Sequence, residues 1–213
     1  MKKSTVLLIG LLFSTYAVFA QVRLGLTAGF QLASEQYKIG GLTLKTNNYP
    51  GYMGGLVVDA IMTEKLSIRS QALYSVKGAK LDLGSLSGGL SIGSVSTIFN
   101  YIEVPVQLTY SLDAGPGWVV LGAGPYVAYA LNAKSTGTNL GQQLNEAVEF
   151  SSKDGDAKRL DYGLRLSVGY ELPSGLMVSG YYSPGLANIV SGPSSAIKNT
   201  AMGLSLGFMF GGN

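Results

Sequence analysis

Apolar and polar residues alternate with a period of two along most of the chain. In the segment 22–32, apolar residues occupy every second position from Val22 to Leu32, and Arg23 and Gln31 lie between them. Side chains two residues apart lie on the same face of a β-strand, so this pattern predicts strands with one apolar face. Eight such strands are predicted, over 22–32, 51–62, 66–77, 100–112, 118–130, 159–172, 176–187 and 200–210.

The connections between these segments alternate in length. The short ones are 63–65, 113–117 and 173–175, and the long ones are 33–50, 78–98, 131–158 and 188–199. An even number of antiparallel strands with short turns at one end and long loops at the other is typical of outer-membrane barrels. The sequence therefore predicts an all-β fold, an eight-stranded antiparallel up-and-down transmembrane β-barrel in the cell outer membrane. The short turns and both termini would be periplasmic, and the long loops extracellular.

A soluble up-and-down barrel such as a lipocalin has the same alternation, but with its apolar face inward. Charge and aromatic residues favour the membrane barrel, because they fit a polar lumen and two interfacial girdles. The predicted polar faces carry Arg23, Arg69, Arg159, Arg165, Asp59, Glu103, Asp161 and Glu171. The apolar faces end in Tyr52, Tyr74, Tyr101, Tyr110, Tyr170, Tyr182, Phe208 and Phe210.

Two ion pairs are predicted inside this barrel. Asp59 and Arg69 lie five residues before and after Glu64, in the middle of a tight turn. In a symmetric hairpin they stand opposite each other on one face. Glu103 and Arg165 lie at similar heights and are expected to pair across the lumen. Because eight strands enclose only enough space for side chains, we interpret both pairs as structural, with a gate or ion site as the alternative.

The first twenty residues are typical of a secretory signal. Two lysines precede the apolar run 6–13, and a cleavage site is expected after Ala20. An uncleaved anchor fits less well, because a spanning helix needs about 20 apolar residues. The predicted organisation is a signal peptide at 1–20 and an outer-membrane barrel domain at 21–213. Without those two lysines, 13 basic residues face 12 acidic ones, and no clustered basic face for nucleic acid remains.

The chain contains no histidine and no cysteine. Sites that pair His with Ser, Asp or Asn are therefore excluded, and so are His- or Cys-ligated metals. We predict no catalysis, no cofactor and no metal site. Glu146, Glu149, Asp154 and Asp156 cluster in one long loop, but they lack the ligand pattern of a calcium loop and are interpreted as a solvated surface.

Several stretches resemble one known family. They are Leu73–Lys80 (LYSVKGAK), Asn100–Leu112 with the core YIEVP, Gly124–Lys134 (GPYVAYALNAK), Asp161–Leu172 (DYGLRLSVGYEL), Gly185–Ile189 (GLANI) and Gly203–Phe210. In order and spacing the chain resembles the PorT-like outer-membrane β-barrels of Bacteroidota. This resemblance implies an integral outer-membrane protein, and the namesake branch is associated with type IX protein secretion and gliding.

The predicted function is a structural or binding role without a large open pore. The partners are outer-membrane lipid and other envelope or secretion proteins, contacted through loops 33–50, 78–98 and 131–158. Long loops on a rigid scaffold commonly carry binding functions. The alternatives are an accessory component of a type IX-like secretion or gliding machinery and a small-solute porin. The Ser/Gly-rich stretch 83–96 either extends a hairpin or forms a flexible tip.

Overall fold

The computed structural model describes residues 21–39, 42–82, 93–139, 142–151, 153, 156–191 and 195–211. The predicted signal peptide, the part of the Ser/Gly-rich stretch up to residue 92, and Asp154 lie outside these residues. No helix in the described ranges is long and apolar enough to cross a membrane.

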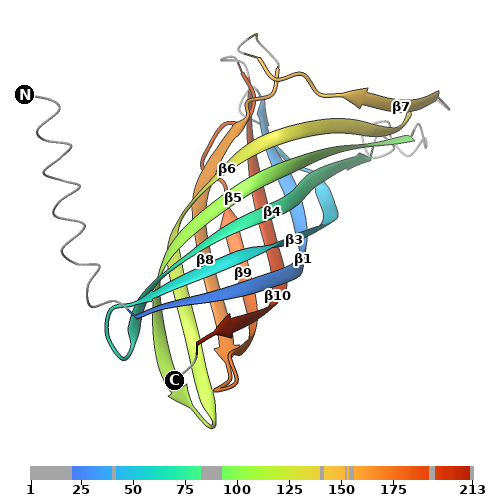
Figure 1. Cartoon of the computed structure of the whole chain (residues 1–213). Helices are drawn as coiled ribbons and strands as arrows, with labels where there is room; N and C mark the ends of the chain where they lie inside the picture. Colours follow the sequence, from blue (N-terminus) through green and yellow to red (C-terminus); the bar gives the residue numbers. More distant parts are fainter. Residues whose placement is uncertain are drawn as a thin grey trace, which may run out of the picture.

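Within the described residues the chain forms ten strands. They are β1 (Gln21–Ile39), β2 (Leu42–Lys45), β3 (Asn47–Ile61), β4 (Leu66–Asp82), β5 (Gly93–Ala114), β6 (Gly117–Asn139), β7 (Gln142–Ala147), β8 (Leu160–Glu171), β9 (Leu176–Pro184) and β10 (Ser195–Phe210). Eight of them form an antiparallel ring in the order β1-β3-β4-β5-β6-β8-β9-β10, which closes where β10 pairs with β1 (Figure 1). The prediction of an eight-stranded antiparallel barrel is confirmed.

Three tight turns lie together at one end of the barrel, here called the turn end (Figure 1). Gly115 and Gly175 occupy these turns with positive φ angles of 60° and 86°, a conformation that favours glycine. In the remaining turn, the Thr63 hydroxyl accepts a hydrogen bond from the Leu66 amide at 3.0 Å. The opposite end, here called the loop end, carries the longer connections.

The strands extend further toward the loop end than the alternation predicts. β5 and β6 have 22 and 23 residues and stay paired from Ala114 with Gly117 to Gly93 with Asn139. Much of the predicted loops 78–98 and 131–158 is therefore strand, and the short strands β2 and β7 pair along β1 and β6. The reason is that backbone pairing continues where the outer face no longer needs to be apolar, so the alternation is lost before the strand ends.

One predicted strand is shorter than expected. β9 ends at Pro184 instead of residue 187. Proline has no backbone N–H to donate. The following residues leave the ring, and Ala187 and Ile189 become buried.

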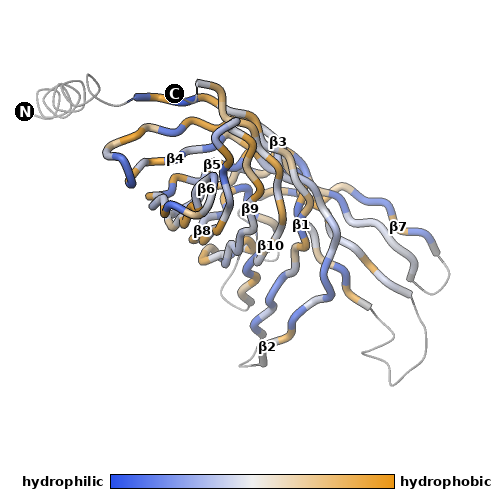
Figure 2. Tube along the Cα trace, turned by 90° about the horizontal axis from the view of Figure 1, so that it is seen from below, coloured by the Kyte–Doolittle hydropathy of each residue, from blue (hydrophilic) through white to orange (hydrophobic). Residues whose placement is uncertain are grey.

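The barrel turns its apolar side chains outward. From Tyr101 to Tyr110, residues of β5 alternate strictly between buried and exposed, and the exposed ones include Val104 and Val106. The buried positions between them hold Glu103 and Gln107. Along the barrel strands, hydrophobic positions alternate with hydrophilic or neutral ones (Figure 2). This inward placement of polar residues is the arrangement of a membrane barrel and the reverse of a soluble one.

Outward-facing aromatic residues lie toward both ends of the apolar surface. Tyr52 and Tyr74 pack against each other toward the loop end, and Phe208 and Phe210 do so toward the turn end. The prediction for Tyr101 was wrong. It shares its face of the strand with Glu103, two residues away, so its side chain is fully buried inside the barrel instead of facing lipid.

Candidate functional site

Near the turn end, four charged side chains form a ring inside the barrel. Arg69 lies 2.8 Å from Asp59 and 3.1 Å from Glu171. Arg23 lies 2.7 Å from Asp59 and also pairs with Glu171. Cations and carboxylates alternate around this ring, so each carboxylate contacts two guanidinium groups. We call it the lower charge ring.

Strand register explains three of the four positions. Arg23 on β1 stands opposite Asp59 on β3, which stands opposite Arg69 on β4. These three residues therefore occupy one rung and one face, and Glu171 reaches them from β8 on the other side of the lumen. The structure thus brings the predicted Asp59 and Arg69 into contact, and it adds Arg23 and Glu171.

A second set of charges lies nearer the loop end and is called the upper charge cluster. Arg165 pairs with Glu103, as the sequence suggested, and its Nε donates a hydrogen bond to the Ser183 hydroxyl at 2.9 Å. Lys77 Nζ lies 2.7 Å from Glu103 and 3.8 Å from Asp161. Two cations therefore face two carboxylates, and the cluster is neutral when all four are charged.

The buried lysine bridges two carboxylates because of a small residue between them. Glu103, Ala128 and Asp161 occupy one rung across β5, β6 and β8. The short side chain of Ala128 leaves space in the lumen between the two carboxylates. Lys77 extends from β4 toward this space, with its Nζ 4.5 Å from the centroid of the Tyr126 ring. Lys77 lies on the same face of its predicted strand as Arg69, but the alternation gives no partner for it. Glu103 on the neighbouring strand stands opposite Leu73, four residues from Lys77, and Asp161 lies on the distant strand β8.

Little space separates the two sets of charges. A cavity of about 30 Å³ lies between them, lined by Arg69, Gln107, Arg165, Met177 and Tyr181, among others. A single water needs about 10–15 Å³ of such space, so the cavity has room for two or three water molecules. So small a volume is typical of a barrel interior filled by side chains.

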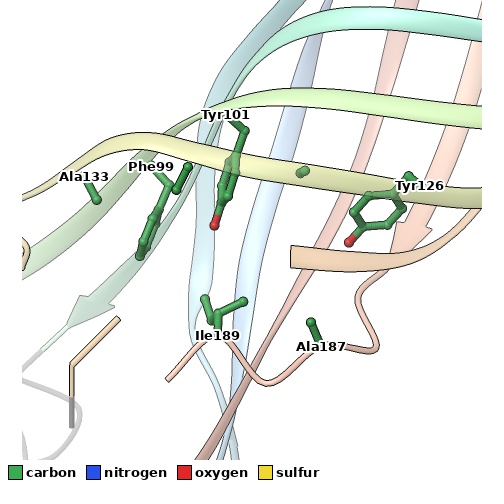
Figure 3. Close-up of a cluster of buried hydrophobic side chains, with 8 residues drawn as sticks. Phe99, Tyr101, Tyr126, Ala133, Ala187 and Ile189 are labelled. Atoms are coloured by element: carbon green, nitrogen blue, oxygen red, sulfur yellow. The ribbon is translucent and has the colours of Figure 1, made fainter. Parts of the chain in front are cut away.

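An apolar cluster lies in the lumen beside the upper charge cluster and continues from it toward the loop end. Its members are Phe99, Tyr101, Tyr126, Ala128, Ala130, Ala133, Ala187 and Ile189. Ile189 and Ala187 come from the segment after β9 and face the aromatic rings of β5 and β6 (Figure 3). Phe99 and Tyr101 stack with ring centroids 5.7 Å apart. We call this cluster the apolar plug.

The turn end is open by comparison. A vestibule of about 600 Å³ lies there, lined by Gln21, Lys65, Trp118 and the lower-ring residues Arg23 and Glu171, among others. The lower charge ring forms its inner boundary. The lumen is therefore accessible from the turn end and filled above.

One further carboxyl group lies buried beyond the lipid-facing surface. Glu35 is three residues past Leu32, an exposed apolar residue of β1. Its Oε2 accepts a hydrogen bond from the Tyr37 hydroxyl at 2.8 Å, and its Oε1 has no hydrogen-bond partner among the described residues. Burial raises the pKa of Glu35 to about 7, the Tyr37 hydrogen bond opposes this, and the Asp161 carboxylate adds to it. Backbone bonds at Glu35 also anchor the chain after β2, since its carbonyl accepts from the Thr46 amide at 3.0 Å.

Comparison with known proteins places this architecture in a family. The model of the outer membrane protein beta-barrel domain matches residues 10–191. The chain belongs to this outer-membrane barrel family. It is therefore an outer-membrane protein, and its apolar outer face lies in the lipid of that membrane.

Solved barrels resemble this family member at low sequence identity. OprG from Pseudomonas aeruginosa is 10% identical with a TM-score of 0.47, over 90% of this chain and 97% of that one. Ail from Yersinia pestis is 12% identical with a TM-score of 0.43, over 89% and 99%. The outer membrane protease OmpT from Escherichia coli is 10% identical with a TM-score of 0.40, over 89% and 96%. A search of curated proteins finds no match.

The charged side chains of the two charge sets pair with one another. Each carboxylate of the two charge sets contacts at least one cation. The described residues include no cluster of three acidic, histidine or cysteine side chains that could hold a metal ion.

Proposed function

We propose that this outer-membrane protein is a closed barrel with a structural or binding role, and that it neither catalyses a reaction nor conducts solutes. The observation that carries the proposal is the filled lumen. The lower charge ring and the upper charge cluster follow one another along the barrel axis, the apolar plug continues from the upper cluster toward the loop end, and a cavity of about 30 Å³ lies between the two charge sets. Eight-stranded barrels generally fill their interiors with side chains.

The binding surface in this proposal is the loop-end part of the paired strands β5 and β6, opposite their turn at Gly115, with β7 along its edge; we call it the raised hairpin. β6 runs ten residues beyond the outward-facing Tyr129, which corresponds to roughly 30 Å along the strand. At the loop end, β4 runs beside β5 as far as Ser94, and β7 runs beside β6 as far as Asn139 (Figure 1). We propose that the turns are periplasmic and that this hairpin stands outside the cell, where it contacts another envelope component.

Planar-bilayer conductance tests the closed lumen. Purified protein at single-molecule density should leave the conductance at baseline in 1 M salt, because no continuous water path crosses the charge sets. Reproducible steps of one size would instead support the alternative of a small-solute porin. A variant that deletes 187–191 serves as a comparison, since it removes part of the apolar plug and leaves both charge sets in place.

The resemblance to the PorT-like branch supports a second candidate, an accessory role in a type IX-like secretion machinery. Two of the stretches that carry the resemblance meet in the apolar plug, since Tyr101 belongs to YIEVP and Ile189 to GLANI. This shared packing supports membership of that branch. Crosslinking in cells from a reactive group on the raised hairpin tests the role: secretion components among the adducts would favour it, and their absence would leave the first candidate.

A further inference from the structure

Three lysines gather on one outward-facing patch at the loop end. Lys198 on β10 stands opposite Gln36 on β1, and Gln36 stands opposite Lys45 on β2. Directly paired residues share a face, and so does Lys38, two residues after Gln36. The Cβ atoms of the three lysines therefore lie within roughly 10 Å of one another.

The register also shows that this face is the outer one. β1 and β10 pair without interruption from Leu24 with Phe210 to Ile39 with Ser195. The even-numbered residues of both strands therefore stay on one side, where Leu32 and Met202 are exposed apolar residues. The carboxylate nearest in sequence, Glu35, faces the lumen instead.

The lysines of this patch are free to bind an anion. In the part of the chain that the structure describes, none of the three belongs to an ion pair. Lys38 and Lys45 are exposed and Lys198 is partly so. Three like charges this close repel one another, and a bound anion relieves that repulsion.

The patch continues the lipid-facing surface upward. The rung of Gln36 lies four residues beyond Leu32, which is about 13 Å along a strand and about 10 Å along the membrane normal at the usual tilt. A phospholipid headgroup layer is only about 5–8 Å thick. The backbone of the lysine patch therefore lies at the outer edge of a phospholipid headgroup layer, at a height that a larger, phosphorylated sugar headgroup would reach.

We infer that Lys38, Lys45 and Lys198 bind the phosphate groups of a glycolipid in the leaflet at the loop end of the barrel. The acyl chains of that lipid lie against Phe30, Leu32, Met202 and Leu204, which are exposed directly below. The inference goes beyond the proposed function, because it assigns a lipid site on the barrel wall and depends neither on the closed lumen nor on the raised hairpin.

The test is titration of full-length mature protein in detergent micelles with a diphosphorylated glycolipid. The K38Q/K45Q/K198Q variant should bind on the order of 100-fold more weakly at low salt, from about fivefold for each lysine near an anionic headgroup. The matched control K80Q/K134Q/K153Q removes three exposed lysines from the same end and should lose less than about tenfold. The variant K38R/K45R/K198R keeps the charge and should bind like the natural protein.

Two further arms identify the source of the phosphate. In the first, the dephosphorylated glycolipid should bind the natural protein as weakly as the phosphorylated glycolipid binds K38Q/K45Q/K198Q. In the second, millimolar inorganic phosphate should not displace the phosphorylated glycolipid from the natural protein. The inference would be overturned if the two glutamine variants lost equal affinity for the glycolipid. It would also be overturned if the dephosphorylated lipid bound as tightly as the phosphorylated one, or if inorganic phosphate displaced the lipid completely. Heat-modifiable migration on gels confirms that each variant is folded before titration.

Discussion

Lys77 Nζ lies 2.7 Å from Glu103 Oε2 inside a barrel whose outer face contacts lipid. The lysine is almost completely buried and also approaches Asp161, which shares a rung with Glu103. Removing one partner from a buried ion pair leaves an uncompensated charge, which is far more costly than the pair was favourable.

The variant Lys77→Met should therefore lose about 3–5 kcal/mol of stability. Urea unfolding in micelles, followed by the fluorescence of Trp118, measures this loss. Lys65→Met, in an exposed turn, is the control and should change stability by less than about 0.5 kcal/mol. Adding Asp161→Asn to Lys77→Met should recover part of the loss, and no recovery would argue against a charge origin.

Because of the lower charge ring, we expect that exchanging the charges of Asp59 and Arg69 does not restore the stability of the protein. If Asp59 and Arg69 formed an isolated pair, the double variant D59R/R69D would restore the contact and much of the stability. In the ring it places a guanidinium next to Arg23 and a carboxylate next to Glu171, so like charges become neighbours. We expect the double variant to be no more stable than either single one. Chemical denaturation of the three proteins measures this, and a rescued double variant would contradict the ring.

Glu35 predicts a pH-dependent stability of the β1–β2 region. Its pKa is about 7 in the folded protein and near 4.5 when the carboxyl group is exposed, so the folded state favours the protonated form. The resulting stabilisation is complete below about pH 4.5 and decreases as the pH rises through 7. The shift corresponds to roughly 3 kcal/mol.

Hydrogen exchange of the Thr46 amide, which bonds to the Glu35 carbonyl, measures this effect. Its protection should fall between pH 5 and pH 8 after correction for the intrinsic exchange rate. Glu35→Gln keeps the shape of the side chain and removes the titration, so it should abolish the change. An unaltered pH profile in that variant would mean that another group is responsible.

Two adjacent glycines provide a test of strand packing. A Cβ atom at Gly55 would lie 1.9 Å from the Ala72 carbonyl oxygen, a backbone atom that cannot move aside without separating β3 from β4. At Gly54 the closest atom would be 3.5 Å away. Gly55→Ala should therefore reduce refolding yield and stability strongly, and Gly54→Ala should be nearly neutral. Heat-modifiable migration and urea midpoints compare them, and similar behaviour of the two variants would contradict the close approach of β4 to Gly55.

The sequence predicts the ring of strands well because membrane lipid imposes the alternation directly on residues such as Leu24 and Val104. It predicts the contact of Asp59 with Arg69 because a tight turn fixes their register locally. Lys77 and Glu171 could be placed on the polar face, but Lys77 reaches Glu103 diagonally on the neighbouring strand. The contacts of Lys77 with Asp161, and of Glu171 with the two arginines, depend on which distant strands face each other across the lumen. The length of β5 and β6 was missed because the alternation disappears outside the membrane although the backbone pairing continues.

The seam between β1 and β10 has a consequence for how the chain folds. It pairs Leu24 with Phe210, whereas the other neighbouring strands in the ring follow one another along the chain. Closing such a long loop is entropically costly, so we expect the seam to form last, after the hairpins. Until then both terminal strands expose unpaired edges that another unfinished barrel can bind. The completion of this seam is therefore the step at which an open sheet that is prone to intermolecular association becomes a single independent molecule.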